Sequence, residues 1–502
     1  MGGVKLNSKS NSATVNTFLS WLQNPLLRMV IRLSGDRRLG NGESYLKAAL
    51  EDIAGEDSGE HGLARTIFSG IISGVVNLGC MTFNVDKSAA VDALTVPYFR
   101  KGLLNVLNGI GKYGVTRPYK TYAPFLVVWN YTNACNLRCK HCYQHADKQT
   151  PDELTTEERF RIVDQLDENE VSAIAFSGGE PLMRKDFFEV ASYAHDKGMY
   201  VSLATNGTLL TNEVLKKLKK GGVEYAEISL DGATKETHDA FRGINGAFEK
   251  TVQGIKNAVK SELFTCVAVT ATKHNINEMP KIIKLGKDLG VDRIIIFNFI
   301  PTGRGKEIIS LDISPVERED LLQMLYQELA HKEMQIICTA PQFSRVCMEQ
   351  SLINKKDIYS PTHFAAQDFD GKAKELVDFL GGCGAGRLYC AIQQNGLVTP
   401  CVFLPIVVGD LRKSSLKQIW DNSKVMEDLR DRSKLQGRCG HCEYKNFCGG
   451  CRARAYGYYN NYLAPDPGCI KELEESSISF SPKKLYEDKQ DSLNKALNVY
   501  AK

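Results

Sequence analysis

Three cysteines stand within one short segment, CNLRCKHC, which contains Cys135, Cys139 and Cys142. Their spacing, C-x3-C-x2-C, places three thiols in one loop directly after the apolar run FLVVWNYT. A [4Fe–4S] cluster is held by four ligands, so a loop with three thiolates leaves one iron with an open coordination position. An open position is typical of a catalytic metal site rather than a structural one. A zinc ion, completed by His141 or His145, is the alternative.

A second group of cysteines lies near the end of the chain. The segment CGHCEYKNFCGGC has the spacing C-x2-C-x5-C-x2-C, and a fifth cysteine follows after seventeen residues. Two more cysteines flank the upstream segment GAGRLYCAIQQNGLVTP. On spacing alone, the main segment is also typical of a zinc knuckle. The group consists of Cys439, Cys442, Cys448, Cys451 and Cys469, with Cys383 and Cys401 upstream.

The composition is that of an ordinary globular protein, with 43% hydrophobic and 24% charged residues. The 502 residues are enough for two to four domains. The net charge of +4 is too small to indicate a nucleic-acid partner, so none is expected. The chain starts without the pattern of a secretory signal, so we expect its 15 cysteines to bind metal rather than form disulfides. A cytoplasmic location is expected.

From residue 123 onward, apolar strand-like runs alternate with amphipathic helical stretches. The run FLVVWNYT is followed by SAIAFSGG, YVSLATNG, YAEISLDG, FTCVAVTAT and RIIIFNFI. One helix has a capping-box signature at Thr155 and Glu158, and another is closed by Gly198. Six buried strands alternating with helices predict a parallel α/β sheet that closes toward a partial barrel. Functional residues are then expected at the carboxyl ends of the strands.

The second predicted strand ends in SGGEP, Ser177–Pro181. Together with the cysteine loop, this segment resembles the radical S-adenosylmethionine (SAM) superfamily, which has a glycine-glycine-glutamate motif at this place. The resemblance implies that the glycines let the backbone approach the methionine part of SAM, and that Glu180 accepts a hydrogen bond from its ammonium group. His141 departs from the pattern, because the family often has an aromatic residue there. The SAM contacts that the resemblance implies are Tyr143, Gly178, Gly179, Glu180, Asn206, Ser229, Asp231, Arg242 and Asn298.

The cysteine-rich segment resembles the SPASM domain, an extension of radical SAM enzymes that binds auxiliary iron–sulfur clusters. It departs from the commonest form between Cys448 and Cys451, where x3 is usual and x2 is present. For one auxiliary cluster the resemblance implies three cysteines and a fourth ligand, expected to be Cys390, with Cys338, Cys347 or an open iron as alternatives. The implied sets are Cys439, Cys442, Cys448 and Cys469 for one cluster, and Cys383, Cys401 and Cys451 for the other.

The resemblance covers roughly residues 123–470 and implies a partial (β/α)6 TIM-like barrel followed by a small cysteine-rich domain. It also implies SAM, a [4Fe–4S] cluster with an open iron site, two auxiliary [4Fe–4S] clusters, and a reduced ferredoxin or flavodoxin-type electron donor. The predicted divisions are a helical extension at 1–120, the barrel at 121–335, a connector at 336–380, the SPASM domain at 381–475 and a tail at 476–502.

The implied chemistry is reductive cleavage of SAM to a 5′-deoxyadenosyl radical, which abstracts a hydrogen atom from the substrate. Within the SPASM group, the run CGGCRARAYGYYNNYLAPDPGC most resembles enzymes of the alternative heme pathway and related cofactor and peptide maturases. We therefore expect oxidative modification or decarboxylation of a tetrapyrrole or peptide substrate. Modification of a lipid chain or other hydrophobic substrate is an alternative, and a non-catalytic iron–sulfur electron carrier is a weaker one.

The first 120 residues lie outside the resemblance and carry 14 Lys and Arg against 9 Asp and Glu. Within them, NPLLRMVIRLSG predicts a helix that is capped by Asn24, begins at Pro25 and ends at Gly35. This helix either lies in a membrane interface or packs on the barrel, so peripheral membrane contact through residues 1–120 is an open alternative. The apolar run that starts at Ile67 is broken by glycines and predicts a buried or interfacial helix rather than a membrane span.

Overall fold

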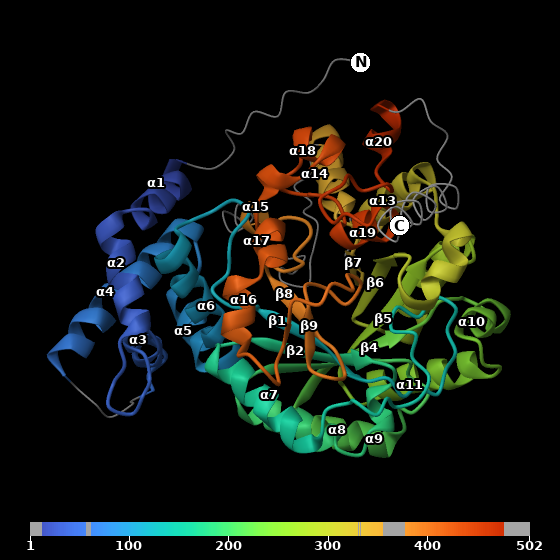
Figure 1. The fold of residues 1–502 in the computed structure, drawn as a ribbon, viewed down its shortest axis with the longest axis horizontal. Helices are drawn as coiled ribbons and strands as arrows, with labels where there is room; N and C mark the ends of the chain where they lie inside the picture. Colours follow the sequence, from blue (N-terminus) through green and yellow to red (C-terminus); the bar gives the residue numbers. More distant parts are fainter. Residues whose placement is uncertain (1–12, 57–61, 330, 332, 355–376, 476–502) are drawn as a thin grey trace, which may run out of the picture.

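The computed structural model describes residues 13–56, 62–329, 331, 333–354 and 377–475. The predicted tail and much of the predicted connector therefore lie outside the described residues. The centre of the molecule is one ten-stranded sheet in the order β10-β9-β8-β1-β2-β3-β4-β5-β6-β7 (Figure 1). Its strands are β1 (Leu126–Thr132), β2 (Ala173–Gly178), β3 (Tyr200–Thr205), β4 (Val223–Ser229), β5 (Phe264–Ala271), β6 (Arg293–Asn298), β7 (Gln335–Cys338), β8 (Tyr389–Ile392), β9 (Leu397–Thr399) and β10 (Gly409–Asp410).

The predicted partial barrel is confirmed, and it is larger than expected. Strands β1 to β7 are parallel neighbours, and the six predicted runs form the first six of them. The seventh strand, β7, crosses the predicted boundary at residue 335. On the other side of β1 lies β8, which is parallel to β1 and continues antiparallel into β9 and β10. The cysteine-rich region therefore extends the barrel sheet instead of folding apart from it.

Helices cover the outer face of the sheet, as the alternating pattern predicts (Figure 1). Side chains alternate between the two faces of each strand, so one set packs under these helices and the other set points into the barrel. The second set includes Tyr225, Cys266 and Ile295, which form a small core inside the barrel. The covering helices are α7 (Thr156–Glu168), α8 (Phe187–Asp196), α9 (Asn212–Lys220), α10 (Lys235–Arg242), α11 (Ala247–Lys260), α12 (Met279–Leu289) and α13 (Pro315–Leu329).

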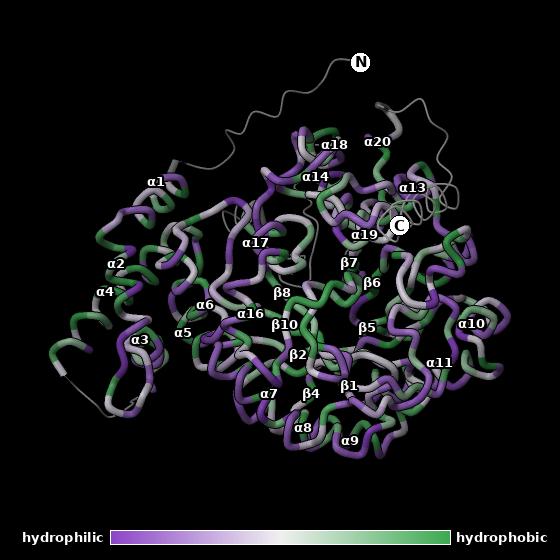
Figure 2. Tube along the Cα trace, in the orientation of Figure 1, coloured by the Kyte–Doolittle hydropathy of each residue, from purple (hydrophilic) through white to green (hydrophobic). Residues whose placement is uncertain are grey.

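The N-terminal extension is helical, as expected, and has its own core around Ile31, Leu50 and Leu107. Asn24 caps α2, and Pro25 begins it. Among the described helices, α4 alone is long and apolar enough to cross a membrane, and only 17% of its most apolar window is buried. Most of α4 is green or white in Figure 2. The helices are α1 (Ala13–Leu22), α2 (Pro25–Asp36), α3 (Tyr45–Ala54), α4 (Leu63–Phe83), α5 (Lys87–Thr95) and α6 (Pro97–Tyr113).

The C-terminal region lies over the barrel (Figure 1). It is built of short helices joined by cysteine-containing loops, as expected of a small domain that relies on metal for stability. Its elements are α14 (Gln342–Asn354), α15 (Val377–Leu380), α16 (Leu416–Asn422), α17 (Lys424–Arg430), α18 (Gly437–His441), α19 (Arg452–Tyr459) and α20 (Ile470–Glu475).

Candidate active site

The structure brings together the three cysteines of the loop after β1. Cys135, Cys139 and Cys142 pack with Leu137 and Ala247 in one small cluster. Burial raises the pKa of the Cys135 thiol to about 12, and the nearby thiols of Cys139 and Cys142 act in the same direction. A thiolate in this place therefore needs compensating positive charge, which bound iron would supply. The loop fits the expected iron–sulfur site.

The glycines of SGGEP let the loop after β2 lie against the loop after β1. Gly178 has a φ of +114°, a backbone conformation that residues other than glycine rarely adopt. A Cβ atom on Gly179 would lie 2.1 Å from the carbonyl oxygen of Ala134. The Gly179 N–H donates to the Thr132 carbonyl at 2.7 Å, and the Glu180 N–H donates to the Ala134 carbonyl at 2.8 Å. The loop after β1 and the loop after β2 are therefore joined by backbone hydrogen bonds.

The carboxylate of Glu180 is fully buried beneath these two loops. It accepts hydrogen bonds from the Thr205 hydroxyl at 2.9 Å and from the Asn206 backbone N–H at 2.9 Å. Burial raises its pKa to about 7, and these hydrogen bonds act in the opposite direction. An ionised carboxylate has about four acceptor positions, so the predicted contact with the SAM ammonium group stays a prediction. Within the protein, Glu180 fixes the end of β3.

Asn206 joins the end of β3 to the cysteine loop. Its side-chain amide donates to the Asn136 side-chain oxygen at 2.7 Å, and Asn136 in turn donates to the Thr208 hydroxyl at 2.8 Å. Asn136 follows Cys135 directly in the sequence. Sequence reasoning missed Asn136, although its place inside the cysteine motif was a signal that could have found it.

Asp231 and Arg242 form a buried ion pair against the same cysteine loop. The Arg242 guanidinium lies 2.6 Å from an Asp231 carboxylate oxygen and donates to the Cys139 sulfur at 3.6 Å. Burial alone would raise the pKa of Asp231, but the Arg242 charge, together with His141 and the hydrogen bond from the Thr270 N–H, lowers it below its usual value. The His141 ring lies 3.4 Å from Asp231 and stacks on Phe241. Asp231 and Arg242, which were predicted to contact SAM, therefore both adjoin the core loop. Ser229, also predicted, is half-buried and ends β4, the strand before them.

Tyr143 lies between the core loop, the barrel and the C-terminal region. Its hydroxyl donates to the Asn130 side-chain oxygen at 3.0 Å and lies 2.9 Å from the Ser177 hydroxyl. Its ring meets the ring of Phe403 at a centroid distance of 4.9 Å. The Asn130 amide donates to Gln393, beyond the end of β8, at 3.0 Å. Neither Phe403 nor Gln393 was predicted, because sequence spacing gives no sign that β8 pairs with β1.

Asn298 ends β6, and its contacts lead toward the C-terminal region. Its side-chain oxygen accepts from the buried Arg318 at 2.8 Å, and its N–H donates to the Thr339 hydroxyl at 2.9 Å. Arg318 also binds Asp312, which binds Arg454 of α19 at 2.8 Å. The structure does not place Asn298 in contact with the other predicted SAM-binding residues. Its side chain supports the interface between barrel and C-terminal region.

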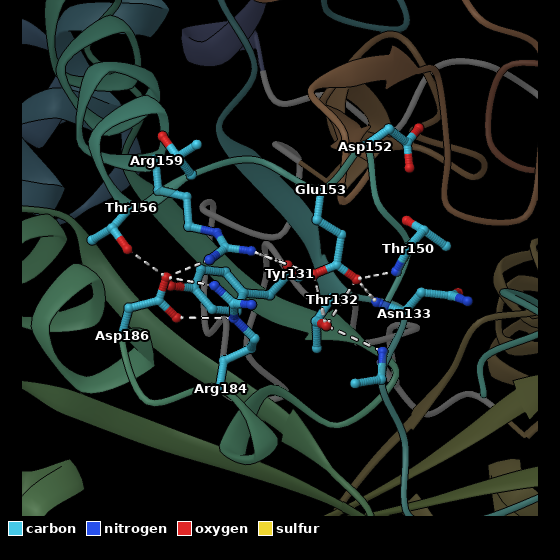
Figure 3. Close-up of polar contacts among 12 residues, drawn as sticks. Tyr131, Thr132, Asn133, Thr150, Asp152, Glu153, Thr156, Arg159, Arg184 and Asp186 are labelled. Atoms are coloured by element: carbon cyan, nitrogen blue, oxygen red, sulfur yellow. Dashed lines mark hydrogen bonds and ion pairs between the residues drawn. The ribbon is translucent and has the colours of Figure 1, made fainter. Parts of the chain in front are cut away.

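A buried polar network fixes the end of β1 just before the cysteine loop (Figure 3). Glu153 accepts from the Thr132 hydroxyl at 3.0 Å and from the Asn133 N–H at 2.7 Å. Arg159 of α7 is fully buried, donates to the Tyr131 carbonyl at 3.1 Å and pairs with Asp186, which follows SGGEP. The network therefore ties both loops of the candidate site to α7.

The C-terminal cysteines form two separate groups. The first group lines one cavity together with Arg345 and Asp466. The second group packs around Ala385 and Leu404, and the Tyr389 hydroxyl donates to the Cys401 sulfur at 3.2 Å. These groups have the membership that the SPASM resemblance implies. They are Cys439, Cys442, Cys448 and Cys469 in the first, and Cys383, Cys401 and Cys451 in the second.

Cys390 does not join the second group. Its neighbour on β8, Tyr389, packs with that group, so strand alternation turns Cys390 to the opposite face. There it is fully buried in the main core with Val127. The expectation that Cys390 is the fourth ligand is therefore not supported. Asp466 was not predicted at all, although its carboxylate accepts from the Cys451 N–H at 2.7 Å and lies beside both groups.

Comparison with known proteins identifies this arrangement. Residues 129–286 match the radical SAM superfamily, and residues 383–443 match the SPASM iron–sulfur cluster-binding domain. The chain is 40% identical over 352 residues to an AdoMet-dependent heme synthase of Methanosarcina barkeri, where AdoMet is SAM. That alignment covers 70% of this chain and 97% of the relative. The chain belongs to the radical SAM superfamily.

Two further proteins are similar to this chain, one in sequence and one in fold. The chain is 30% identical over 363 residues to the mycofactocin maturase MftC of Mycobacterium tuberculosis, covering 71% of this chain and 85% of that protein. Streptococcus suis SuiB bound to S-adenosylmethionine has the same fold, with a TM-score of 0.59 at 15% identity over 85% of this chain and 93% of its own. The radical SAM chain described here is therefore an enzyme, not an electron carrier, and it uses SAM, a [4Fe–4S] cluster and auxiliary clusters.

Proposed function

We propose that this enzyme oxidatively decarboxylates carboxylate side chains of an iron tetrapyrrole. The observation that carries the proposal is the 40% identity to an AdoMet-dependent heme synthase, which extends over 97% of that relative. Such a decarboxylation releases CO2 and leaves a carbon–carbon double bond after one hydrogen atom and one electron have been removed. Peptide modification, suggested by the 30% identity to a maturase, is the second candidate.

The site residues have distinct roles in this proposal. Cys135, Cys139 and Cys142 would hold the core cluster, which when bound supplies the electron that cleaves SAM to methionine and a 5′-deoxyadenosyl radical. Gly178 and Gly179 let the loop after β2 pack against the backbone before the core cysteines, and the Asp231–Arg242 pair holds the loop of Cys139 in place. The rings of Tyr143 and Phe403 pack against each other at the barrel mouth.

The second cysteine group lies beside that mouth, where an electron from the substrate would be taken up. Phe403 touches the Tyr143 ring and donates its N–H to the Cys401 sulfur at 3.4 Å. We propose that this group and the first both hold auxiliary clusters, the second with a fourth ligand other than Cys390. A reduced ferredoxin or flavodoxin-type protein is the proposed electron donor.

The test is an anaerobic assay of the reconstituted enzyme with SAM, a chemical reductant and iron coproporphyrin III. Mass spectrometry should detect a porphyrin that has lost carboxyl groups, together with 5′-deoxyadenosine. Cys139→Ala should abolish both products, whereas Cys80→Ala, a change remote from the site, should retain them. SAM cleavage with an unchanged porphyrin would reject the tetrapyrrole proposal, and a modified peptide in the same assay would support the second candidate.

A peripheral membrane contact is proposed for α4. Its outer side exposes Leu63 by 80%, Ile67 by 53% and Met81 by 77%. A Cβ atom on Gly70 or Gly74 would meet no other atom within 4 Å. A charge-free apolar face of this length is typical of a helix that binds an apolar partner or a lipid surface.

A further inference from the structure

Glu227 is a carboxyl group inside the barrel that the roles above do not use. It lies in the middle of β4, between Ala226 and Ile228, which both pack in the core beneath the outer helices. Tyr225, two residues earlier, belongs to the core inside the barrel, so alternation points Glu227 inward as well. In the sheet register Glu227 stands beside Cys266 of β5, another inward-facing residue.

Within the described part of the chain, the Glu227 carboxylate makes no hydrogen bond and no ion pair. The nearest opposite charge is that of Arg293 on β6. The Arg293 guanidinium is engaged elsewhere, because it donates twice to the Gln335 side chain, at 3.0 and 2.6 Å, and lies 4.9 Å from the ring centre of Phe264. A half-buried carboxyl group without a partner is unfavourable when ionised.

Two buried carboxyl groups of the barrel change charge near neutral pH, Glu180 and Glu227, and of these Glu180 already accepts hydrogen bonds from Thr205 and Asn206. Burial raises the pKa of Glu227 to about 7, and the more distant Arg293 charge opposes that effect. Tyr225, Cys266 and Tyr143 also face it, and burial raises the pKa of each so far that all three stay neutral. Unionised, Glu227 is a hydrogen-bond donor directed into the barrel.

The interior near Glu227 combines aromatic walls with few polar groups. Phe297 of β6 packs with the inner core, and its ring lies 6.3 Å from that of Phe403. The Tyr143 ring also contacts Phe403, and the Tyr143 hydroxyl forms a hydrogen bond with the Ser177 hydroxyl. A flat, largely apolar molecule with an acidic side chain fits these surroundings, since its carboxylate would find a donor in Glu227 and its ring would meet aromatic side chains.

We propose that Glu227, in its protonated form, donates a hydrogen bond to a carboxylate of the substrate inside the barrel and so selects substrates with acidic side chains. This inference rests on the proposed function, because it takes the substrate to be a tetrapyrrole with carboxylate arms. Two carboxyl groups that share one proton form a strong, charge-assisted hydrogen bond. If both were ionised they would repel each other, so binding requires the proton.

The test is equilibrium dialysis of iron coproporphyrin III against the holoenzyme between pH 6 and pH 9. Above the Glu227 pKa, we expect the affinity of the wild type to fall about tenfold for each pH unit. Glu227→Gln, a permanent neutral donor, should retain the affinity seen at pH 6 and lose the pH dependence. Glu227→Leu should bind about tenfold or more weakly at pH 6, because a hydrogen bond to a charged group is lost.

Glu224→Gln is the matched control, because Glu224 lies on the same strand and its carboxylate accepts from the Tyr98 hydroxyl of α6, away from the inner core. This variant should bind as the wild type does at every pH. Unchanged affinity in Glu227→Leu, or an unchanged pH profile in Glu227→Gln, would overturn the role of Glu227 and leave the proposed function standing. Failure of the wild type to bind the porphyrin at any pH would overturn both.

Discussion

A buried aspartate–arginine pair adjoins each cysteine region of this enzyme. Asp231 pairs with Arg242 beside Cys139 in the core loop, and Asp466 pairs with Arg454 at 3.2 Å beside Cys451. In both pairs burial acts to raise the pKa of the aspartate, and the arginine charge together with backbone hydrogen bonds lowers it below its usual value. In the first pair the Arg242 guanidinium donates to the Cys139 sulfur, and in the second the Asp466 N–H donates to the Cys439 sulfur. Each cysteine region is therefore supported by a buried pair of opposite charges.

His238 connects the Asp231 site to a prediction about pH. The Asp231 N–H donates to His238 Nδ1 at 3.2 Å, which requires that nitrogen to be unprotonated. Burial lowers the His238 pKa from 6.5 to about 4. Between pH 6.5 and 4 the unfolded chain therefore binds a proton that the folded chain does not, and stability falls as the pH falls. His238→Asn keeps an acceptor without this titration, so acidification should favour the variant over the wild type by up to about 3 kcal/mol.

Urea unfolding of the two proteins at pH 7, 5.5 and 4.5 measures this difference. The gap between their free energies of unfolding should shift steadily in favour of His238→Asn as the pH decreases. A gap that is the same at all three pH values would show that folding leaves the His238 pKa unchanged.

At the scale of elements, the sequence predicted the strands and helices that local residue patterns determine. It did not predict which distant strands pair with each other. The six barrel strands and the capping box of α7 are confirmed, because alternation and capping are local signals. The pairing of β8 with β1 joins residues more than 250 positions apart, and no local pattern reports it. For the same reason the face of β8 that Cys390 occupies, and the contacts of Gln393 and Phe403, became clear only in the structure.

Arg159 of α7 offers a prediction at this scale. Its guanidinium is fully buried, lies 4.2 Å from the ring centre of Tyr131 and serves the carboxylates of Asp186 and Glu153. Arg159→Leu would leave the buried carboxylates of Asp186 and Glu153 without the arginine charge, which should lower the free energy of unfolding by about 3–5 kcal/mol. The end of β1 would lose its support, so iron incorporation into the core loop should also fall.

Arg161→Leu is the matched control, because Arg161 is an exposed arginine on the same helix. Urea unfolding and iron content after anaerobic reconstitution should be near wild type for Arg161→Leu and clearly lower for Arg159→Leu. Equal stability of the two variants would mean that the network of Figure 3 contributes little to the site.

At the scale of the whole molecule, the enzyme consists of a catalytic part shared with its relatives and a further helical part. The alignment with the heme synthase covers 97% of that relative but 70% of this chain. The N-terminal helices attach to the barrel through α6, whose Lys101 binds Glu170 at 3.3 Å and whose Asn105 donates to the Ala123 carbonyl at 2.8 Å. Helix α2 packs on α6, with Arg28 donating to the Ile110 carbonyl at 3.3 Å. Helix α2 is therefore packed on another helix of the extension, not on the barrel itself, and its outer side exposes Leu26 and Met29. The longest helix with an exposed apolar face is α4.

The open face of α4 leads to the last prediction. The full-length holoenzyme should co-sediment with vesicles of phosphatidylcholine and phosphatidylglycerol, because burying Ile67 and Met81 in the interface contributes about 25 cal/mol for each Å² of apolar area. Replacing both by aspartate should reduce the bound fraction at least tenfold. Leu352→Asp is the matched control, since Leu352 on α14 is 57% exposed outside this face and its change should leave binding intact. Vesicle binding that survives the double change would reject the lipid contact. A concentration-dependent dimer that the same change dissociates would assign the face of α4 to a second copy of the chain.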